Sequence, residues 1–149
     1  MSANHDIAKL DDLIVTTIDS IKGYEHSAEH AHEGYARLFR KMAEERREVV
    51  AELQAQSRAL GGTPNDFGST AATIHRRFED LRVALGGGDE AIIKEIERGE
   101  DYLKQEFERA LSSDRLGEAT RAVIEHCFHS VDRGHWRAHE LKQGFAEAK

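Results

Sequence analysis

Apolar residues recur at three- and four-residue spacing along almost the whole 149-residue chain, and this period limits the possible folds more than any other feature. Such spacing is typical of amphipathic helices, each with one side to bury. Proline occurs once, at Pro64, and glycine-rich breaks fall at 61–62 and 86–88. The sequence therefore predicts an all-α protein.

The periodic pattern of apolar residues predicts four long helices and a shorter one. The long helices are expected at 6–33, 35–60, 90–111 and 114–145, and the shorter one at 69–85. Gly61 and Pro64 suit the end of the second long helix, because glycine ends helices well and proline cannot continue them. Asp89 follows the second glycine break and can cap the third long helix.

The lengths of the connections predict the topology. Short turns join the first two and the last two long helices, so each pair should form an antiparallel hairpin. Residues 61–89 join the hairpins, and their helix would span about 25 Å at 1.5 Å per residue. A crossover of that length can travel the full height of a bundle. We expect one domain over residues 1–149, a ferritin-like up-down-down-up four-helix bundle with a long helical crossover.

Composition excludes several classes of partner and compartment. The net charge of −7 argues against nucleic acid, which requires clustered Lys and Arg. No apolar run approaches 18 residues, so we expect no membrane span. The single cysteine, Cys127, lies on an apolar stripe and is expected to fill the core. It cannot form an internal disulfide, and the N-terminus lacks a secretory pattern, so the expected location is cytoplasmic.

Short segments in order along the chain carry a family resemblance. They are Gly23-Tyr24, Ala28-Glu29, Gly61-Gly62-Thr63-Pro64, Gly68-Ser69, His75-Arg76, Glu97-Arg98-Gly99-Glu100-Asp101 and His135. In these segments the chain resembles a bacterial family of small ferritin-like four-helix-bundle proteins of unknown function. Two departures are Phe78, where a tryptophan is expected, and Trp136 after His135, where an acid is expected. The resemblance implies the fold and, by analogy alone, a stress-associated role.

Three charged residues, Glu25, Arg46 and Glu100, stand among the apolar positions of three different helices. Charges are seldom buried unless they pair with each other or bind a metal. A guanidinium has five donors and stays charged, so Arg46 could satisfy both carboxylates. The first interpretation is therefore a buried network of Arg46, Glu25 and Glu100 in a non-catalytic or weakly metal-binding protein.

A metal centre is the alternative interpretation. Ferritin-like di-metal sites take one Glu from each of two helices and a Glu-x-x-His pair from each of the other two. The candidate ligands are Glu25, Glu29, Glu97, Glu100 and His135. Such ligands suit iron or manganese, and the activity would be oxidase or peroxidase chemistry or metal storage. Arg46 weighs against this interpretation, because it stands where the second helix would supply a ligand and it repels cations.

The other histidines are expected to be structural or solvated. His26 and His30 lie on the side of the first helix opposite its apolar stripe, where solvent is a better prediction than zinc. On the last helix His126, His129 and His139 also point away from the apolar stripe. No Ser/His/Asp order, phosphate-binding loop or Cys-x-x-Cys pair supports a hydrolase or a nucleotide-binding protein.

Two further features concern contacts outside the core. His75 and Arg76 lie at the edge of the crossover helix's stripe and are expected to anchor that helix to the bundle. Trp136 points outward on the last helix, with Phe128 nearer its flank. Either the crossover helix or a second subunit should cover Trp136, and we expect a homodimer.

Overall fold

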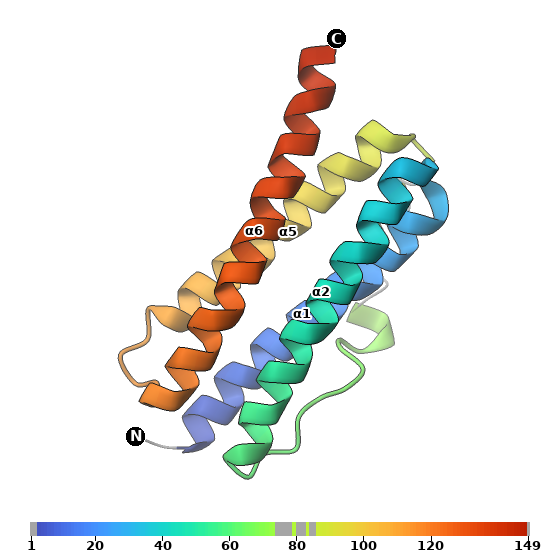
Figure 1. Cartoon of the computed structure of the whole chain (residues 1–149). Helices are drawn as coiled ribbons and strands as arrows, with labels where there is room; N and C mark the ends of the chain where they lie inside the picture. Colours follow the sequence, from blue (N-terminus) through green and yellow to red (C-terminus); the bar gives the residue numbers. More distant parts are fainter. Residues whose placement is uncertain (1–2, 74–78, 80–82, 84–85, 149) are drawn as a thin grey trace.

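A computed structural model describes residues 3–73, 79, 83 and 86–148 of the chain. The described residues form four long helices and no strand, so the predicted all-helical bundle is confirmed (Figure 1). The helices are α1 (Ala3–His30), α2 (Glu33–Ala59), α5 (Asp89–Leu111) and α6 (Glu118–Ala148). Among these residues no helix has the length and apolar character needed to cross a membrane.

Contacts between helix ends establish the directions of the helices. Each helix packs against two others: α1 against α2 and α5, and α6 against α5 and α2. At one end, the backbone N–H of His32, just before α2, donates to Asp89 at the start of α5 (3.1 Å). At the other end, the backbone N–H of Gly117 donates to Asp6. Helices α1 and α6 therefore run one way and α2 and α5 the other (Figure 1).

Two helix boundaries differ from the sequence-based prediction for reasons of tertiary structure. The first helix ends at His30 rather than at residue 33, because Asp89 of α5 binds the backbone of His32 and holds the turn. The last helix begins at Glu118 rather than at residue 114. The backbone N–H of Gly117 donates to the buried carboxylate of Asp6, whose two oxygens lie 3.3 and 3.2 Å from the nitrogen. A carboxylate in this position stabilises the start of a helix, so α6 begins at the next residue.

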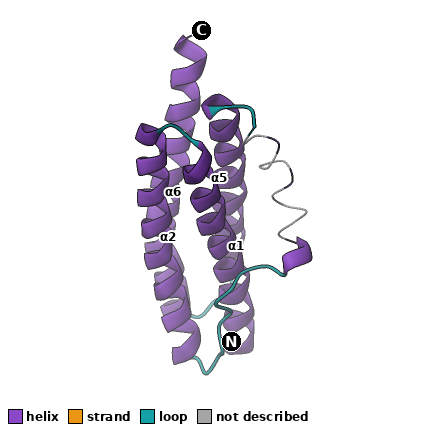
Figure 2. Cartoon of the chain, turned by 90° about the vertical axis from the view of Figure 1, so that its right-hand side faces the viewer, coloured by secondary structure: helices purple, strands orange, loops and turns teal. Residues whose placement is uncertain are grey.

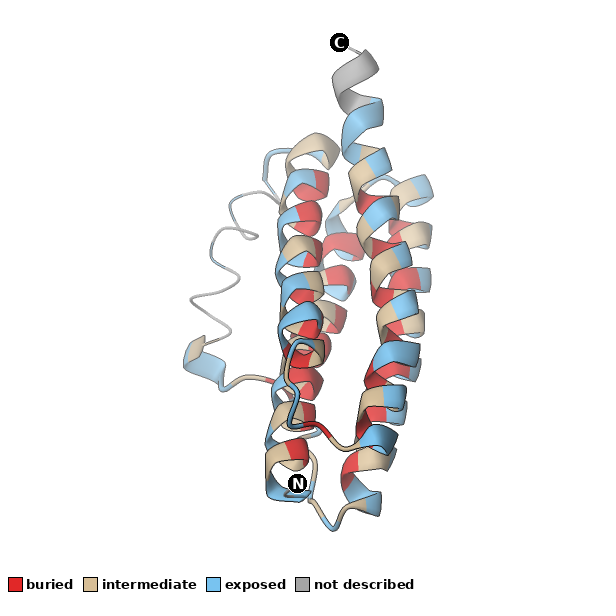
Figure 3. Ribbon diagram, turned by 90° about the vertical axis from the view of Figure 1, so that its left-hand side faces the viewer, coloured by how far each residue is buried: buried red, intermediate tan, exposed pale blue. Residues whose placement is uncertain are grey.

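The apolar core lies along the facing sides of the four helices, where buried residues follow the predicted stripes (Figure 3). Leu13, Phe39, Ile92 and Ile124 are at most 1% exposed, one from each helix. Burying a side chain of this size stabilises the fold by about 1.5–3 kcal/mol. Cys127 is also buried, as predicted for a core residue.

The Cys127 thiol is held in its protonated form. Its Sγ donates to Glu52 Oε2 at 3.2 Å. Burial, together with this hydrogen bond and the carboxylate charge, raises the pKa of Cys127 far above its ordinary range. A thiolate is the nucleophilic form, so this cysteine is an inert part of the core.

The described start of the crossover that follows α2, residues 60–73, is fastened by polar contacts to the outside of the bundle, beside α1 (Figure 2). The Asn65 carboxamide oxygen accepts the backbone N–H groups of Phe67 (2.8 Å) and Gly68 (2.6 Å), which forms a turn. Asp19, buried on α1, accepts the N–H of Ser69 (3.0 Å) and its hydroxyl (2.5 Å). Gly68 has a φ of +84°, and a Cβ there would lie 2.7 Å from Asp19. Glycine adopts this positive φ without strain and has no Cβ to clash with Asp19.

The described anchor of the crossover is thus Asp19 with Asn65 and Ser69, none of which was predicted to anchor it. Helical structure in the crossover begins at residue 71. The predicted anchors His75 and Arg76, and the departure at Phe78, lie outside the described residues.

Candidate functional site

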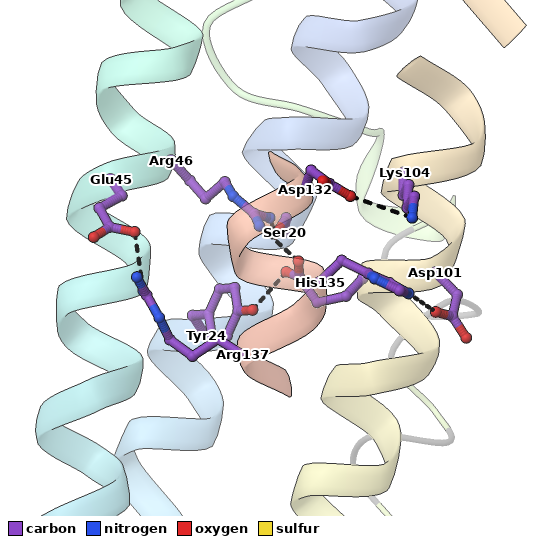
Figure 4. A network of polar contacts seen from close by, with 10 residues as sticks. Ser20, Tyr24, Glu45, Arg46, Asp101, Lys104, Asp132, His135 and Arg137 are labelled. Atoms are coloured by element: carbon purple, nitrogen blue, oxygen red, sulfur yellow. Dashed lines mark hydrogen bonds and ion pairs between the residues drawn. The ribbon is translucent and has the colours of Figure 1, made fainter. Parts of the chain in front are cut away.

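Arg46 lies in the interior of the bundle and is 2% exposed. It comes from the middle of α2, between the buried residues Ala43 and Val49 of the same helix. Its Nη2 donates to Glu100 Oε2 at 2.6 Å, and Glu100, from α5, is also 2% exposed. The structure therefore brings together two of the three charged residues that the apolar stripes contain (Figure 4).

Two side chains of α1 complete this arrangement. The Tyr24 hydroxyl donates to Glu100 Oε1 at 2.5 Å, and Arg46 Nη1 donates to Ser20 Oγ at 3.0 Å. The Arg46 guanidinium carbon also lies 5.8 Å from the centre of the Tyr24 ring, within the range of a cation–π contact. We call Ser20, Tyr24, Arg46 and Glu100 the polar core cluster. Each oxygen of its carboxylate has a donor.

Helix α6 contributes to the cluster by the absence of a side chain. A Cβ at the buried Gly134 would lie 2.2 Å from Arg46 Nη2 and 3.0 Å from Glu100 Oε2. Glycine inside a helix is less favourable than alanine by about 1 kcal/mol. Here it leaves the space that the guanidinium occupies.

The electrostatics of the cluster hold its groups in their ordinary charge states. Burial, and then the charge of Glu100, raise the pKa of Tyr24 well above 10, so its hydroxyl stays a neutral donor. Burial by itself lowers the pKa of Arg46, but its negatively charged surroundings, Glu100 foremost, outweigh burial and the net pKa is raised. The guanidinium is therefore charged and neutralises the carboxylate.

Three partly exposed pairs surround the cluster and tie α6 to its neighbours (Figure 4). They are Arg137–Glu45 (3.1 Å) to α2, and Lys104–Asp132 (3.2 Å) and His135–Asp101 (2.6 Å) to α5. They lie nearer solvent than the cluster and contribute less per pair, since exposed pairs are typically worth 1 kcal/mol or less.

Glu25 is not part of the cluster, and the prediction that Arg46 neutralises it is wrong. Its Oε2 accepts from Arg47 Nη2 at 2.9 Å, and its side chain is 49% exposed. Glu25 lies at the flank of α1 that faces α2, and Tyr24, the preceding residue, takes the interior place. A carboxylate that finds a cation at the surface avoids the cost of desolvation.

The five residues proposed as metal ligands do not form a common ligand set. Glu29 is exposed, and Glu25 pairs with Arg47. Glu97 accepts from Lys142 Nζ at 2.9 Å, and its other oxygen lies 3.3 Å from His139 Nδ1. His139 was expected to point away from the apolar stripe, but it reaches across to α5.

The two remaining candidate ligands also have partners from within the chain. His135 Nε2 lies 2.6 Å from Asp101, and Glu100 binds Arg46 and Tyr24. Within the described part of the chain, no three His, Cys, Asp or Glu side chains are placed to hold a metal ion together. The residues present do not fit a di-metal centre.

Sequence reasoning missed three members of the site. Tyr24 was assigned to the apolar stripe, although its phenol requires a hydrogen-bond partner when it is buried. Nothing in the sequence pattern indicated that Ser20 would bind Arg46. Gly134 falls at a core position of the last helix, between Val131 and Ala138, and a helical glycine there indicates close packing.

The fold and the cluster define a class: an all-helical bundle with a buried ion pair in its interior. Within this class the chain belongs to a family described as "Domain of unknown function (DUF2383)", whose model matches residues 5–113. The matched region contains α1 from residue 5 on, α2, the crossover and α5, and with them all four residues of the polar core cluster. A search of curated proteins finds no match to the chain.

Proposed function

We propose that this protein is a non-catalytic helical bundle of ferritin-like topology, in which a buried ion pair takes the place of a metal centre. One observation carries the proposal: both oxygens of Glu100 already have donors, Arg46 at 2.6 Å and Tyr24 at 2.5 Å. A cation at Glu100 would have to share each carboxylate oxygen with a donor already in place, and one of these donors, Arg46, is itself a cation.

The charge of Arg46 supports the same conclusion. Two unit charges 4 Å apart interact by about 4 kcal/mol at an effective dielectric constant of 20, so the guanidinium repels a divalent ion at that distance by about 8 kcal/mol and offsets the attraction of Glu100 for the ion. Any metal that binds this protein would therefore bind weakly or away from the cluster. Iron or manganese bound at the cluster, with oxidase, peroxidase or storage activity, is the competing function.

The ferritin-like assignment rests on the directions of the helices and on the crossover. Helices α2 and α5 run parallel although they follow each other in the chain, and the described start of their connection, residues 60–73, is fastened to the outside of α1. A ferritin-like bundle has one long crossover of this kind. A bacterial source and a stress-associated role follow from the sequence resemblance alone.

Metal analysis of protein purified without a histidine tag tests the proposed function. The wild-type chain, incubated with ferrous or manganous ion and desalted, should retain well under one ion per chain and consume neither oxygen nor peroxide. The Arg46→Met variant should behave in the same way. Retention of one or two ions per wild-type chain, lost in Glu100→Gln, would overturn the proposal in favour of the competing function.

We also propose a reducing compartment, the cytoplasm, because Cys127 is a buried thiol hydrogen-bonded to Glu52. A thiol reagent should leave the native protein unmodified and label one thiol per chain after unfolding. A disulfide-linked species in protein prepared from its native cells would contradict this location.

A further inference from the structure

Trp136, the single tryptophan of the chain, stands on the outside of α6 and is 50% exposed. Its ring makes edge contacts with His135 (5.2 Å between ring centres) and His139 (5.7 Å), and Lys104 Nζ lies 5.3 Å from its centre. The described part of the crossover is fastened to α1 instead. A large aromatic side chain held in place at the surface is a common anchor of protein interfaces.

The residues around Trp136 form a stripe along the outer side of α6. The stripe, called here the α6 outer face, consists of Glu125, His129, Asp132, Arg133, Trp136 and Glu140. Their spacing of three and four places them on one side of the helix. All are exposed except Asp132, which is half-buried and held by Lys104.

We propose that a second copy of this chain docks on the α6 outer face, with the two α6 helices antiparallel and the two-fold axis between Asp132 and Arg133. Residues equally distant from the axis then face each other. Asp132 faces the partner's Arg133 and Arg133 faces the partner's Asp132, so the centre forms two ion pairs. Trp136 faces the partner's His129 on both sides, which adds two aromatic contacts.

The acid–base order at the centre of the stripe favours a second copy as the occupant, although the stripe as a whole has three acids and one base. An isologous interface must be complementary to itself, and the order acid–base at residues 132 and 133 meets this condition when the helices are antiparallel. The fit is incomplete at the ends of the stripe, where Glu125 faces the partner's Glu140. This repulsion limits the affinity, so the dimer should be weak and should dissociate on dilution.

Sedimentation velocity over a range of concentrations tests the dimer. The wild-type chain should form dimers as concentration rises, with a parallel change in the emission of its single tryptophan. Trp136→Ala should raise the dissociation constant tenfold or more. Tyr102→Ala, which removes an exposed aromatic from α5, is the matched control and should leave it unchanged.

Charge-reversal variants locate the axis without relying on the loss of a side chain. Arg133→Asp alone and Asp132→Lys alone should each weaken self-association, since each places like charges at the centre. Mixed together, these two variants should form heterodimers, because every central pair is then complementary. Glu140→Lys should tighten the wild-type dimer by removing the repulsion with the partner's Glu125. Circular dichroism confirms that each variant is folded.

Three outcomes would overturn the proposal. The wild-type chain could sediment as a monomer at every concentration up to its solubility limit. It could dimerise with an affinity that Trp136→Ala leaves unchanged. The charge-reversal variants could fail to prefer each other in the mixture, which would place any dimer on another face. None of these outcomes depends on whether the cluster binds metal, so the proposed function is tested separately.

Discussion

Arg46 and Arg47 are adjacent in the sequence, and each binds a glutamate of another helix at a similar distance. Arg46 binds Glu100 at 2.6 Å and Arg47 binds Glu25 at 2.9 Å. Both side chains of the first pair are 2% exposed, whereas those of the second are 43% and 49% exposed. Distance alone therefore does not distinguish a structural ion pair from a surface contact; the surrounding solvent does.

The two pairs differ in what happens when one partner is lost. At the surface, water and salt replace the missing charge, so exposed pairs are worth about 1 kcal/mol or less. In the interior no water or salt replaces the missing charge. The remaining charge must either lose its ionisation or stay buried without a partner, and both cost free energy. Substitutions at the two pairs and at their neighbours test this contrast.

Replacing Arg46 with methionine should have the largest effect. The change leaves the Glu100 carboxylate buried without a counter-charge, which costs about 3–5 kcal/mol of the free energy of unfolding. Urea unfolding at pH 7 measures it. The triple variant Arg46→Met, Glu100→Leu and Tyr24→Phe removes both charges and the phenol hydroxyl that would otherwise lose its acceptor, and it should recover most of the loss. A single-variant loss below about 1 kcal/mol would show that the pair is solvated like Arg47–Glu25.

Tyr24→Phe should cost about 1.5–3 kcal/mol at pH 7, because it removes a hydrogen bond to a buried carboxylate. It also tests the raised pKa of Tyr24. An unfolded tyrosine titrates near pH 10. The stabilisation that depends on this phenol is therefore complete below about pH 10 and is lost as pH rises towards the higher folded-state pKa. Wild-type stability should fall above about pH 10, and Tyr24→Phe should fall less steeply. Equal slopes would refute the shift.

Gly134→Ala should destabilise the protein by about 1–2 kcal/mol, although alanine is the better helix former. The added Cβ would lie 2.2 Å from Arg46 Nη2, so the guanidinium must move away from its partners. Gly99→Ala is the matched control in α5, because no atom lies within 4 Å of its Cβ position. It should stabilise the protein by about 0.5–1 kcal/mol. The two substitutions should thus shift the thermal midpoint in opposite directions, and a rise in both would remove the packing argument.

Arg47→Met should have the smallest effect, a change of about 0.5 kcal/mol or less that shrinks further with added salt. Urea unfolding at low and high ionic strength measures it beside Arg46→Met, whose loss should be nearly independent of salt. A loss from Arg47→Met comparable to that from Arg46→Met would show that burial does not separate the two pairs.

Much of the helical structure could be predicted from the sequence, because a helix requires only local periodicity. The expected helix at 90–111 matches Asp89–Leu111, and that at 35–60 matches Glu33–Ala59. The boundaries set by another helix were missed. Asp6 of α1 marks the start of α6, and Asp89 of α5 holds the turn after α1. Neither contact can be derived from the spacing within one helix.

The candidate site was predictable in part for the same reason. Arg46 is surrounded by apolar neighbours at helical spacing, so its burial followed from α2 alone. Glu25 and Glu100 both looked suitable as its partner. Only the relative rotation and height of α1 and α5 made Glu100 the partner and left Glu25 at the surface with Arg47.

Helix formation and the burial of one charge follow from the order of the amino acids, because the apolar period acts within a single helix. Which carboxylate meets that charge, which tyrosine completes the pair and which glycine makes room for it depend on how the helices pack together. These choices depend on the register between helices, which packing and desolvation select together and which no single helix encodes.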